Sequence, residues 1–436
     1  MKKILLFLIP SLLVSGMASA EVSAETAFVF NTFLFIFGGI LVMFMALGFA
    51  MLEAGFVRKK NTSAILLKNI ALYSIAGIMF YLVGYSLMYV DVSGWIGSLG
   101  GAFYNPSSDE LALLDGADNV AAIADTGYSV ASDWFFQMVF CATAISIVSG
   151  ACAERIKVWP FMIFAAIMTG IIYPIYGSWT WGGGWLAEMG FSDFAGSTIV
   201  HSVGGWAAVV GCLILGPRAG KYSKDGKISP IAGANMPLAA LGTFILWFGW
   251  FGFNGGSQLA LGTVDDATAV AKIFINTNLA ACGGVIANAL ITRFLTGKTD
   301  VIMMLNGCLG GLVAITAEPL APTPGAAIII GAIGGAIVVL GTKLLFKLKI
   351  DDVVGAIPVH MFAGIWGTLA VPLSNADANF GAQFLGVISV IAFVFVVSFV
   401  IWKVMASTFG IRVSKEAETK GTDVAEIGVI AYSIRD

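Results

Sequence analysis

The chain has 436 residues, of which 58% are hydrophobic and only 11% are charged, and its mean hydropathy is +0.91. This composition cannot supply the charged surface that a soluble domain of this size needs, so it predicts a protein embedded largely in a lipid bilayer. The net charge of −3 provides no basic surface, and we expect no nucleic-acid partner.

The first twenty residues are typical of a secretory signal peptide. Two lysines, an apolar stretch at 4–17 and a small-residue cleavage site at 18–20 follow one another. The alternative is a short first membrane helix, but Pro10 and the apolar length do not suit a span. We therefore predict a cleaved signal at 1–20 and a mature chain that begins outside the cytoplasm, in a bacterial inner membrane.

Eleven later segments are apolar enough to cross the membrane, since about 20 residues of helix span a hydrocarbon core of ~30 Å. They define an all-α polytopic membrane domain at 21–405, followed by a cytoplasmic tail at 406–436. The predicted spans are 28–52, 64–89, 133–152, 158–176, 197–216, 230–255, 267–291, 301–316, 323–345, 353–373 and 381–405.

The loops between these segments alternate in charge. Lysine and arginine follow the first, third, fifth, seventh and ninth spans, whereas the other loops have neither. The long loop at 91–132 contains six acidic residues instead. The positive-inside rule then places the N-terminus outside and the C-terminus inside.

Charged residues within the spans are few. Lys68, Lys272 and Glu53 lie near span ends, where we expect the lysines to extend to an interface and Glu53 to serve packing or capping. Gly331 and Gly335 have the spacing of close helix packing. We find no GxxxxGK[ST] loop, which argues against an ATP-driven pump within this chain.

The only two histidines, His201 and His360, each follow an aspartate by eight residues, and each pair opens a span. The aspartates are Asp193 and Asp352. The two elements are five spans apart and therefore point in opposite directions, which indicates an inverted repeat of five plus five spans with one extra helix. Both histidines then approach the bilayer middle, where ionisable groups usually line a substrate or proton path.

A single buried histidine could be purely structural, but two at symmetric positions make that interpretation weaker. The main alternative to a transport role for the two histidines is metal binding. The five cysteines form no CxxC pair, and the two aspartates lie at opposite membrane faces. We therefore expect no disulfide, metal centre or other cofactor.

Aromatic residues gather at the predicted outer mouth. Trp181 lies in the loop before the fifth span, while Phe140 and Phe253 lie deeper than an interfacial aromatic belt would. Aromatic faces with a hydroxyl such as that of Ser257 can hold a small bare cation. A hydrophobic constriction below would refuse a hydrated ion. The pattern suggests a pore for a weakly acidic cation that can release its proton.

Four segments at 153–157, 193–201, 250–257 and 351–360 read AERIK, DFAGSTIVH, WFGFNGGS and DDVVGAIPVH. They resemble the signature segments of the Amt/Mep/Rh ammonium transporters, and the resemblance covers essentially the whole mature chain. Trp181 and the residues around Ser257 favour the Amt branch.

The resemblance implies a role for each matching residue. Trp181, Phe140 and Ser257 would form the outer ammonium-binding site, supported by buried Asp193. Phe140 and Phe253 would form the stacked gate. The pore lining would comprise His201, His360 and Trp250.

The resemblance also implies a homotrimer with one pore per subunit and a cytoplasmic PII-type signal protein as a partner. The tail at 421–432 resembles the segment through which Amt subunits communicate, but it departs from the pattern at Thr422, Ile427 and Val429. These departures bear on regulation rather than on transport.

The function expected is ammonium transport without covalent chemistry, so we do not expect an enzyme. Ammonium would lose its proton at the gate, and ammonia would cross beside the histidines. Three alternatives stay open: a neutral gas channel for ammonia or carbon dioxide, a receptor that binds ammonium with little flux, and a secondary transporter for another amine or alkali cation.

Overall fold

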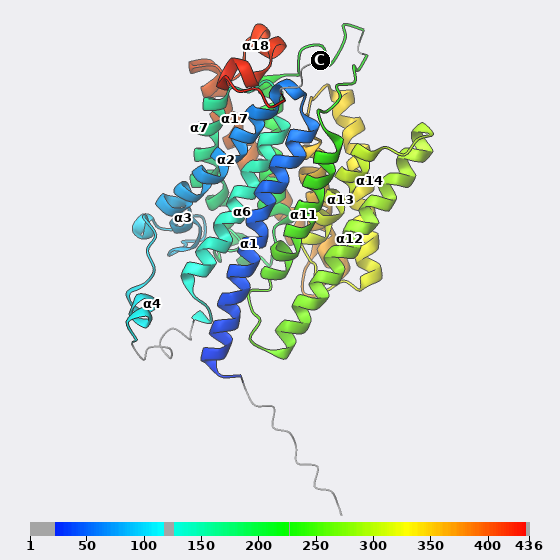
Figure 1. Ribbon diagram of the computed structural model, residues 1–436. Coiled ribbons are helices and arrows are strands. Elements are labelled where there is room, and N and C mark those ends of the chain that lie inside the picture. Colours follow the sequence, from blue (N-terminus) through cyan, green and yellow to red (C-terminus); the bar gives the residue numbers. More distant parts are fainter. Residues whose placement is uncertain (1–21, 117–125, 226, 433–436) are drawn as a thin grey trace, which may run out of the picture.

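The computed structural model describes residues 22–116, 126–225 and 227–432, and all regular elements in these ranges are helices. The proposed signal peptide at 1–20 lies outside them. The helices form one elongated bundle (Figure 1), and two further views show most of them running between the same two ends.

Nine helical stretches in the described residues are long and apolar enough to cross a membrane, and two shorter apolar ones accompany them. Together they occupy all eleven ranges expected as spans. The nine are α1 (Ala24–Phe56), η1–α2–η2–α3 (Lys59–Asn61, Thr62–Met79, Phe80–Gly84, Tyr85–Tyr89), α6 (Val130–Ala151), α7–η6–α8 (Val158–Ile167, Met168–Ile172, Tyr173–Ser178), η7–α10 (Ser197–Ser202, Val203–Leu215), α11 (Met236–Gly256), α12 (Val264–Thr296), α14 (Pro324–Leu348) and α16–η10–α17 (Phe380–Val390, Ile391–Phe395, Val396–Thr408).

The shorter pair are α13 (Val301–Thr316) and η8–α15–η9 (Ile357–Phe362, Ala363–Ala370, Val371–Leu373). Small helical turns lie in the loops and in the C-terminal segment: η3 (Leu99–Gly101), α4 (Ser108–Ala112), η4 (Leu113–Asp115), α9 (Trp185–Glu188), α18 (Lys415–Lys420) and η11 (Asp423–Ile427).

Capping residues set the helix boundaries that apolar length alone left open. α11 begins at Met236 rather than near 230, because the Asn235 side chain accepts the N–H of Leu238 and starts the helix there. α12 is longer than expected, since Thr263 and Asp266 form a capping box at its start. Gly297, with φ of 74°, ends it.

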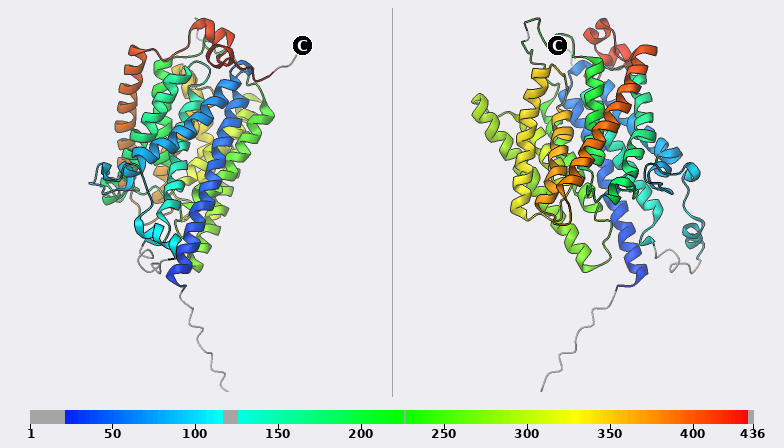
Figure 2. Two further views of the ribbon diagram at one scale, coloured as in Figure 1. Left: turned by 60° about the vertical axis from the view of Figure 1, so that its left-hand side comes forward. Right: turned by 180° about the vertical axis from the view of Figure 1, so that it is seen from behind.

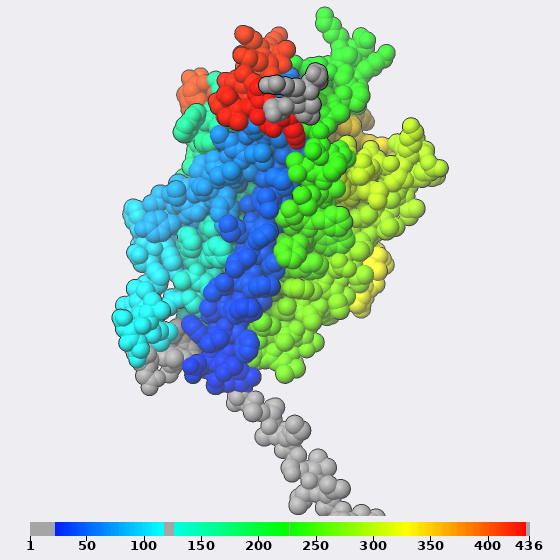
Figure 3. All heavy atoms as spheres, in the orientation of Figure 1, coloured from blue at the N-terminus to red at the C-terminus, as the bar shows by residue number. Residues whose placement is uncertain are grey.

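Glycines allow the main helices to pack closely. α1 and α11 lie side by side along the molecule (Figure 3), and a Cβ on Gly242 would lie 2.2 Å from the backbone nitrogen of Leu52. The expected close packing at Gly331 is confirmed: a Cβ there would lie 2.0 Å from the carbonyl oxygen of Ala280 on α12. Such contacts are typical of helices associating in lipid.

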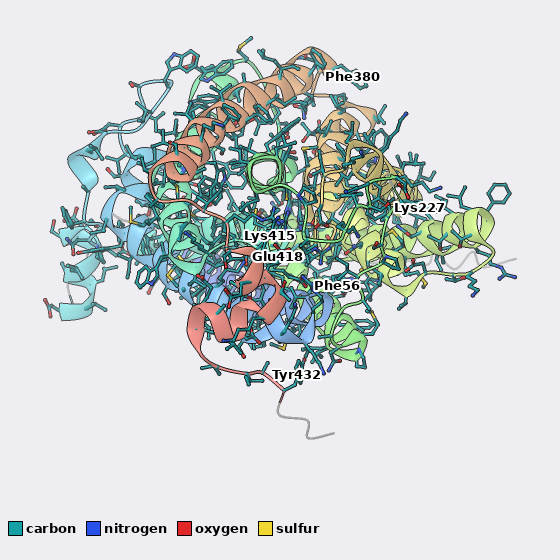
Figure 4. The ribbon with its side chains drawn as sticks, turned by 90° about the horizontal axis from the view of Figure 1, so that it is seen from above. Phe56, Lys227, Phe380, Lys415, Glu418 and Tyr432 are labelled. Carbon is teal, nitrogen blue, oxygen red and sulfur yellow. The ribbon has the colours of Figure 1, made fainter. Side chains whose placement is uncertain are left out.

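Residues 409–432 fold back over one end of the bundle, called here the tail face (Figure 4). Val413 donates its N–H to the carbonyl of Arg155, and Thr422 donates its N–H to the Asn61 side chain. Asp423 accepts the N–H of Ala64. The tail therefore covers the start of α2.

Two charged residues lie deeper than expected. Lys68 is only 3% exposed, so the expectation that it extends to an interface is wrong. Its ammonium donates to the carbonyl of Ser149 on α6 and lies over the ring of Phe161. Glu53 is fully buried and caps no helix, because the cap of α1 is Val57. The tail covers the start of α2, which removes the interface that Lys68 would have reached.

Candidate functional site

The two histidines meet inside the bundle. The Nδ1 atoms of His201 and His360 lie 3.2 Å apart, and both rings are buried. Each histidine lies in a π-helical turn, η7 or η8, at the start of a longer helix. Wide turns of this kind often occur at functional sites. Because one Nδ1 must donate and the other accept, the pair can share a single proton.

The two histidine-bearing segments are built alike. The carboxylate of Asp193 accepts four backbone N–H groups at the start of η7, and that of Asp352 accepts three at the start of η8. The donors are Gly196, Ser197, Thr198 and Ile199 for Asp193, and Val354, Gly355 and Ile357 for Asp352. Each aspartate thus satisfies the free donors of a buried helix start and fixes the histidine eight residues later.

Aromatic rings form a column that leads to the histidine pair. The ring centroids of Trp181 and Phe140 are 5.9 Å apart in an edge-on contact, and those of Phe140 and Phe253 are 4.0 Å apart and stacked. His201 continues the stack 5.3 Å from Phe253, and His360 follows 5.2 Å further on. Phe140 is 1% exposed and Phe253 is fully buried, so the stack leaves no room for a hydrated ion.

Hydrogen bonds hold the ends of this column. The indole N–H of Trp181 donates to the carbonyl of Asp193 over 3.0 Å, which links the outer ring to the histidine segment. Ser257 lies one turn beyond Phe253 on α11, and its hydroxyl donates to the carbonyl of Phe253 over 2.8 Å. The lone pairs of the Ser257 oxygen are left to accept a hydrogen bond from a cation.

Trp250 packs flat against the histidine pair. Its ring lies 5.1 Å from that of His201 at an interplanar angle of 22°. Its indole N–H donates to the hydroxyl of Thr316 on α13 over 2.8 Å. Thr316 in turn donates to the carbonyl of Leu312, so both groups are satisfied in a fully buried position.

A narrow cavity of about 10 Å³ continues from His360 toward the tail face. It has room for roughly one water molecule. Glu53, Gly150 and Asn306 are among its lining residues, and the ring of Phe49 lies 6.0 Å from that of His360. A larger pocket of about 420 Å³ shares three of these lining residues, Asn306, Val354 and Gly355. The two cavities are therefore neighbours, and both lie on the tail-face side of the histidine pair.

An ion-pair network fixes the tail face beside that pocket. The guanidinium of Arg218 donates to both carboxylate oxygens of Asp351 and lies 3.3 Å from Glu154. Burial alone would raise the pKa of Asp351, but the hydrogen bonds and charge of Arg218 outweigh burial and lower the pKa to about 2. Asp351 therefore stays ionised at any physiological pH.

The structure brings the rings chosen from sequence into one column, with Asp193 and Ser257 joined to it by hydrogen bonds. Sequence reasoning missed Thr316, Phe49 and the cavity containing Glu53. A hydroxyl or a carboxylate on an apolar helix signals little until the helix rotation is known, and no motif marks these positions.

Known proteins are similar to this chain over nearly its whole length. The model of the Ammonium Transporter Family matches residues 32–432. Ammonium transporter Amt2 of Archaeoglobus fulgidus is 40% identical over 90% of this chain and 86% of its own length. A putative ammonium transporter of Synechocystis is 41% identical over 95% of this chain and 92% of its own length.

Solved structures agree with the fold. A structure described as a Sensor Amt Protein superposes with a TM-score of 0.84 at 36% identity, covering 93% of this chain and all of that one. Mep2 of Candida albicans superposes with a TM-score of 0.80 at 26% identity, covering 94% of this chain and 92% of the Mep2 chain.

Proposed function

The chain belongs to the ammonium transporter family, and from that premise we propose that it moves ammonium across the membrane through the aromatic column and the histidine pair. The observation that carries the proposal is the unbroken stack from Phe140 and Phe253 to two buried histidines that share a proton position.

The substrate would first bind as the charged ion at the outer mouth. The Trp181 and Phe140 rings offer π-faces, and Ser257 offers a hydroxyl oxygen. Cation–π contact contributes about 0.5–2 kcal/mol, and together with one hydrogen bond it replaces part of the hydration of the ion. Asp193 supports this site indirectly, since its carbonyl fixes the Trp181 indole.

Passage of the stacked phenylalanines would require the ion to lose its proton. The ring centroids of Phe140 and Phe253 are 4.0 Å apart and both side chains are buried, so an ion that passes between them loses its hydration water. Burying an unpaired charge costs many kcal/mol, and a weak acid escapes that cost by deprotonation. Neutral ammonia would then cross beside His201 and His360, with Trp250 closing one side. No covalent step is involved.

The arrangement in the membrane follows the same proposal. Residues 1–20 would be a cleaved signal, 21–405 the membrane domain with eleven spans in an inverted repeat, and 406–436 a cytoplasmic regulatory tail. The outer mouth would face the periplasm of a bacterium. We further propose a homotrimer with one pore per subunit and a PII-type protein that docks on the tail face.

The decisive experiment records current from liposomes that contain the purified protein after an ammonium pulse, with His201→Ala beside the wild type. We expect a wild-type current that the variant loses. A potassium pulse is the matched control, because potassium has no proton to release and should give no current. Ammonia-driven alkalinisation without current would contradict the proposal and favour a neutral gas channel, and Trp181→Leu would then leave flux unchanged. Competition by another amine or by an alkali cation would favour a different substrate.

A second candidate function is ammonium sensing with little flux. It is favoured by the similarity to the solved Sensor Amt Protein. Saturable ammonium binding to the purified protein, with neither current nor alkalinisation in liposomes, would support sensing over transport.

A further inference from the structure

A buried carboxylate lies beyond the histidine pair, on the side of the tail face. Glu53 of α1 is fully buried in the bundle. Its Oε2 accepts hydrogen bonds from the Asn69 amide and the Ser149 hydroxyl, each over 2.9 Å. Its Oε1 has no hydrogen-bond partner among the described residues. A buried carboxylate oxygen without a donor is costly, so its retention calls for an explanation beyond packing.

The free oxygen faces the cavity that His360 also lines. A Cβ on Gly150 would lie 3.3 Å from Glu53 Oε1 and 2.6 Å from Val354, and all four residues line this cavity. The missing side chain at Gly150 thus keeps the space open. Its volume of about 10 Å³ suits one water molecule, which has polar partners in Glu53 and His360.

A positive charge nearby allows Glu53 to act as a base. The Lys68 ammonium is held by the carbonyl of Ser149 and the ring of Phe161 in the same cluster. Two further charged residues in the described part of the chain, Arg155 and Asp352, lie near this cluster, and both have partners: Arg155 donates to backbone carbonyls, and Asp352 accepts backbone N–H groups. An opposite charge favours the ionised carboxylate, which can then take up a proton.

The cavity adjoins a larger pocket on the tail-face side. Its lining residues Asn306, Val354 and Gly355 belong equally to the larger pocket that Lys221 and Lys343 line. A proton released from Glu53 would therefore meet water near the tail face, whereas the packed aromatic rings block the opposite direction.

We propose that Glu53 relays the proton from the histidine pair toward the tail face. This relay rests on the proposed function, because it needs a proton delivered by ammonium to the histidines. An N–H proton of the His360 imidazolium passes to the cavity water, while that water gives one of its own protons to Glu53 Oε1. A neutral imidazole, a water and a carboxylic acid result, and the acid then returns its proton to water that reaches the larger pocket.

The test measures ammonium-evoked current and internal alkalinisation in liposomes for Glu53→Gln, Ser149→Ala and the wild type. Glutamine keeps an oxygen for Asn69 and Ser149 but cannot take up a proton. We expect Glu53→Gln to lower the current at least about a hundredfold, the lower end of the range for a lost general base, while ammonia still alkalinises the vesicles. Ser149→Ala removes one hydrogen bond of the same cluster but keeps the carboxylate, so its current should fall less than that of Glu53→Gln, by no more than about tenfold.

The outcomes separate the relay from the proposed function. A Glu53→Gln current within twofold of wild type overturns the relay alone, provided that His201→Ala still abolishes the current. A wild type without current overturns the proposed function and the relay with it. If Glu53→Gln does not reconstitute, Gly150→Ala decides the question, because its methyl fills the cavity without changing the carboxylate. Loss of current in Gly150→Ala with ammonia flux retained supports the relay, and an unchanged current overturns it.

Discussion

The Nδ1 atoms of His201 and His360 face each other at 3.2 Å. One imidazole must donate and the other accept, so the tautomer of each ring depends on its partner. Neither ring can keep this arrangement when the other is replaced. The two histidines therefore form one structural unit that can hold a single shared proton.

A unit of this kind predicts strongly non-additive variants. We expect His201→Ala and His360→Ala each to abolish the ammonium current, and the double variant to be no worse than either single one. The measurement is current per reconstituted protein, with circular dichroism as the check on folding. Independent losses that multiply in the double variant would contradict a shared proton position.

Trp181 should set the affinity for ammonium rather than the maximal rate. Replacing it with leucine removes the π-face, which is worth about 0.5–2 kcal/mol, so half-saturation should rise about two- to thirtyfold. The concentration dependence of the current measures this. Trp185→Leu is the matched control, because Trp185 lies in the same loop but stacks on Trp95 and not on Phe140. Equal effects of both substitutions would argue against a recruiting role for Trp181.

Much of the architecture was readable from sequence because the bilayer imposes it. Runs of apolar residues had to be helices of spanning length, and the spacing from Asp193 to His201 repeats from Asp352 to His360 because both segments start with the same backbone cap. How deeply a charged side chain is buried in the bundle was less predictable. Lys68 looked interfacial because it is close to a helix end in the chain, but the tail, which comes more than 300 residues later, buries that end.

Thr316 illustrates a second limit of sequence reasoning. Its hydroxyl accepts the indole N–H of Trp250, a partner 66 residues away that no local pattern reveals. Thr316→Val should leave that N–H unpaired and lower stability by about 1–3 kcal/mol. Thermal unfolding in detergent measures the loss. Thr243→Val is the control, because within the described ranges the hydroxyl of buried Thr243 bonds only back to the carbonyl of Ala239 on its own helix. Equal destabilisation by the two valines would show that the bond to Trp250 contributes nothing specific.

Asp351 should stabilise the tail face in a pH-dependent way. Asp351→Asn leaves the buried Arg218 without its bidentate carboxylate, which should cost about 3–5 kcal/mol at neutral pH. Because Arg218 holds the pKa of Asp351 near 2, below its usual value of 3.8, this contribution is complete above pH 4. It is lost as the pH falls toward 2.

The melting temperatures of wild type and Asp351→Asn in detergent should therefore converge between pH 4 and pH 2. The exposed Asp377, changed to asparagine, serves as the control and should melt like the wild type at each pH. A constant difference down to pH 2 would rule out ionisation of Asp351 as its source.

Gly421 should determine whether the tail stays docked. Its φ of 108° is strained for any other residue, and a Cβ would lie 2.4 Å from the carbonyl oxygen of Lys60 at the start of α2. Gly421→Ala should therefore release the tail, including the contacts of Thr422 with Asn61 and of Asp423 with Ala64. Limited trypsin digestion at Lys415 and Lys420 measures this release as faster cleavage.

Gly428→Ala is the control that separates backbone strain from steric collision, because Gly428 has a φ of 74° but no atom within 4 Å of an added Cβ. If Gly428→Ala is cleaved as fast as Gly421→Ala, strain within the tail and not its contact with α2 controls docking. If neither variant is cleaved faster than the wild type, the tail is held by its other contacts with the bundle, such as the hydrogen bonds that Arg412 donates to the carbonyls of Leu215 and Pro217.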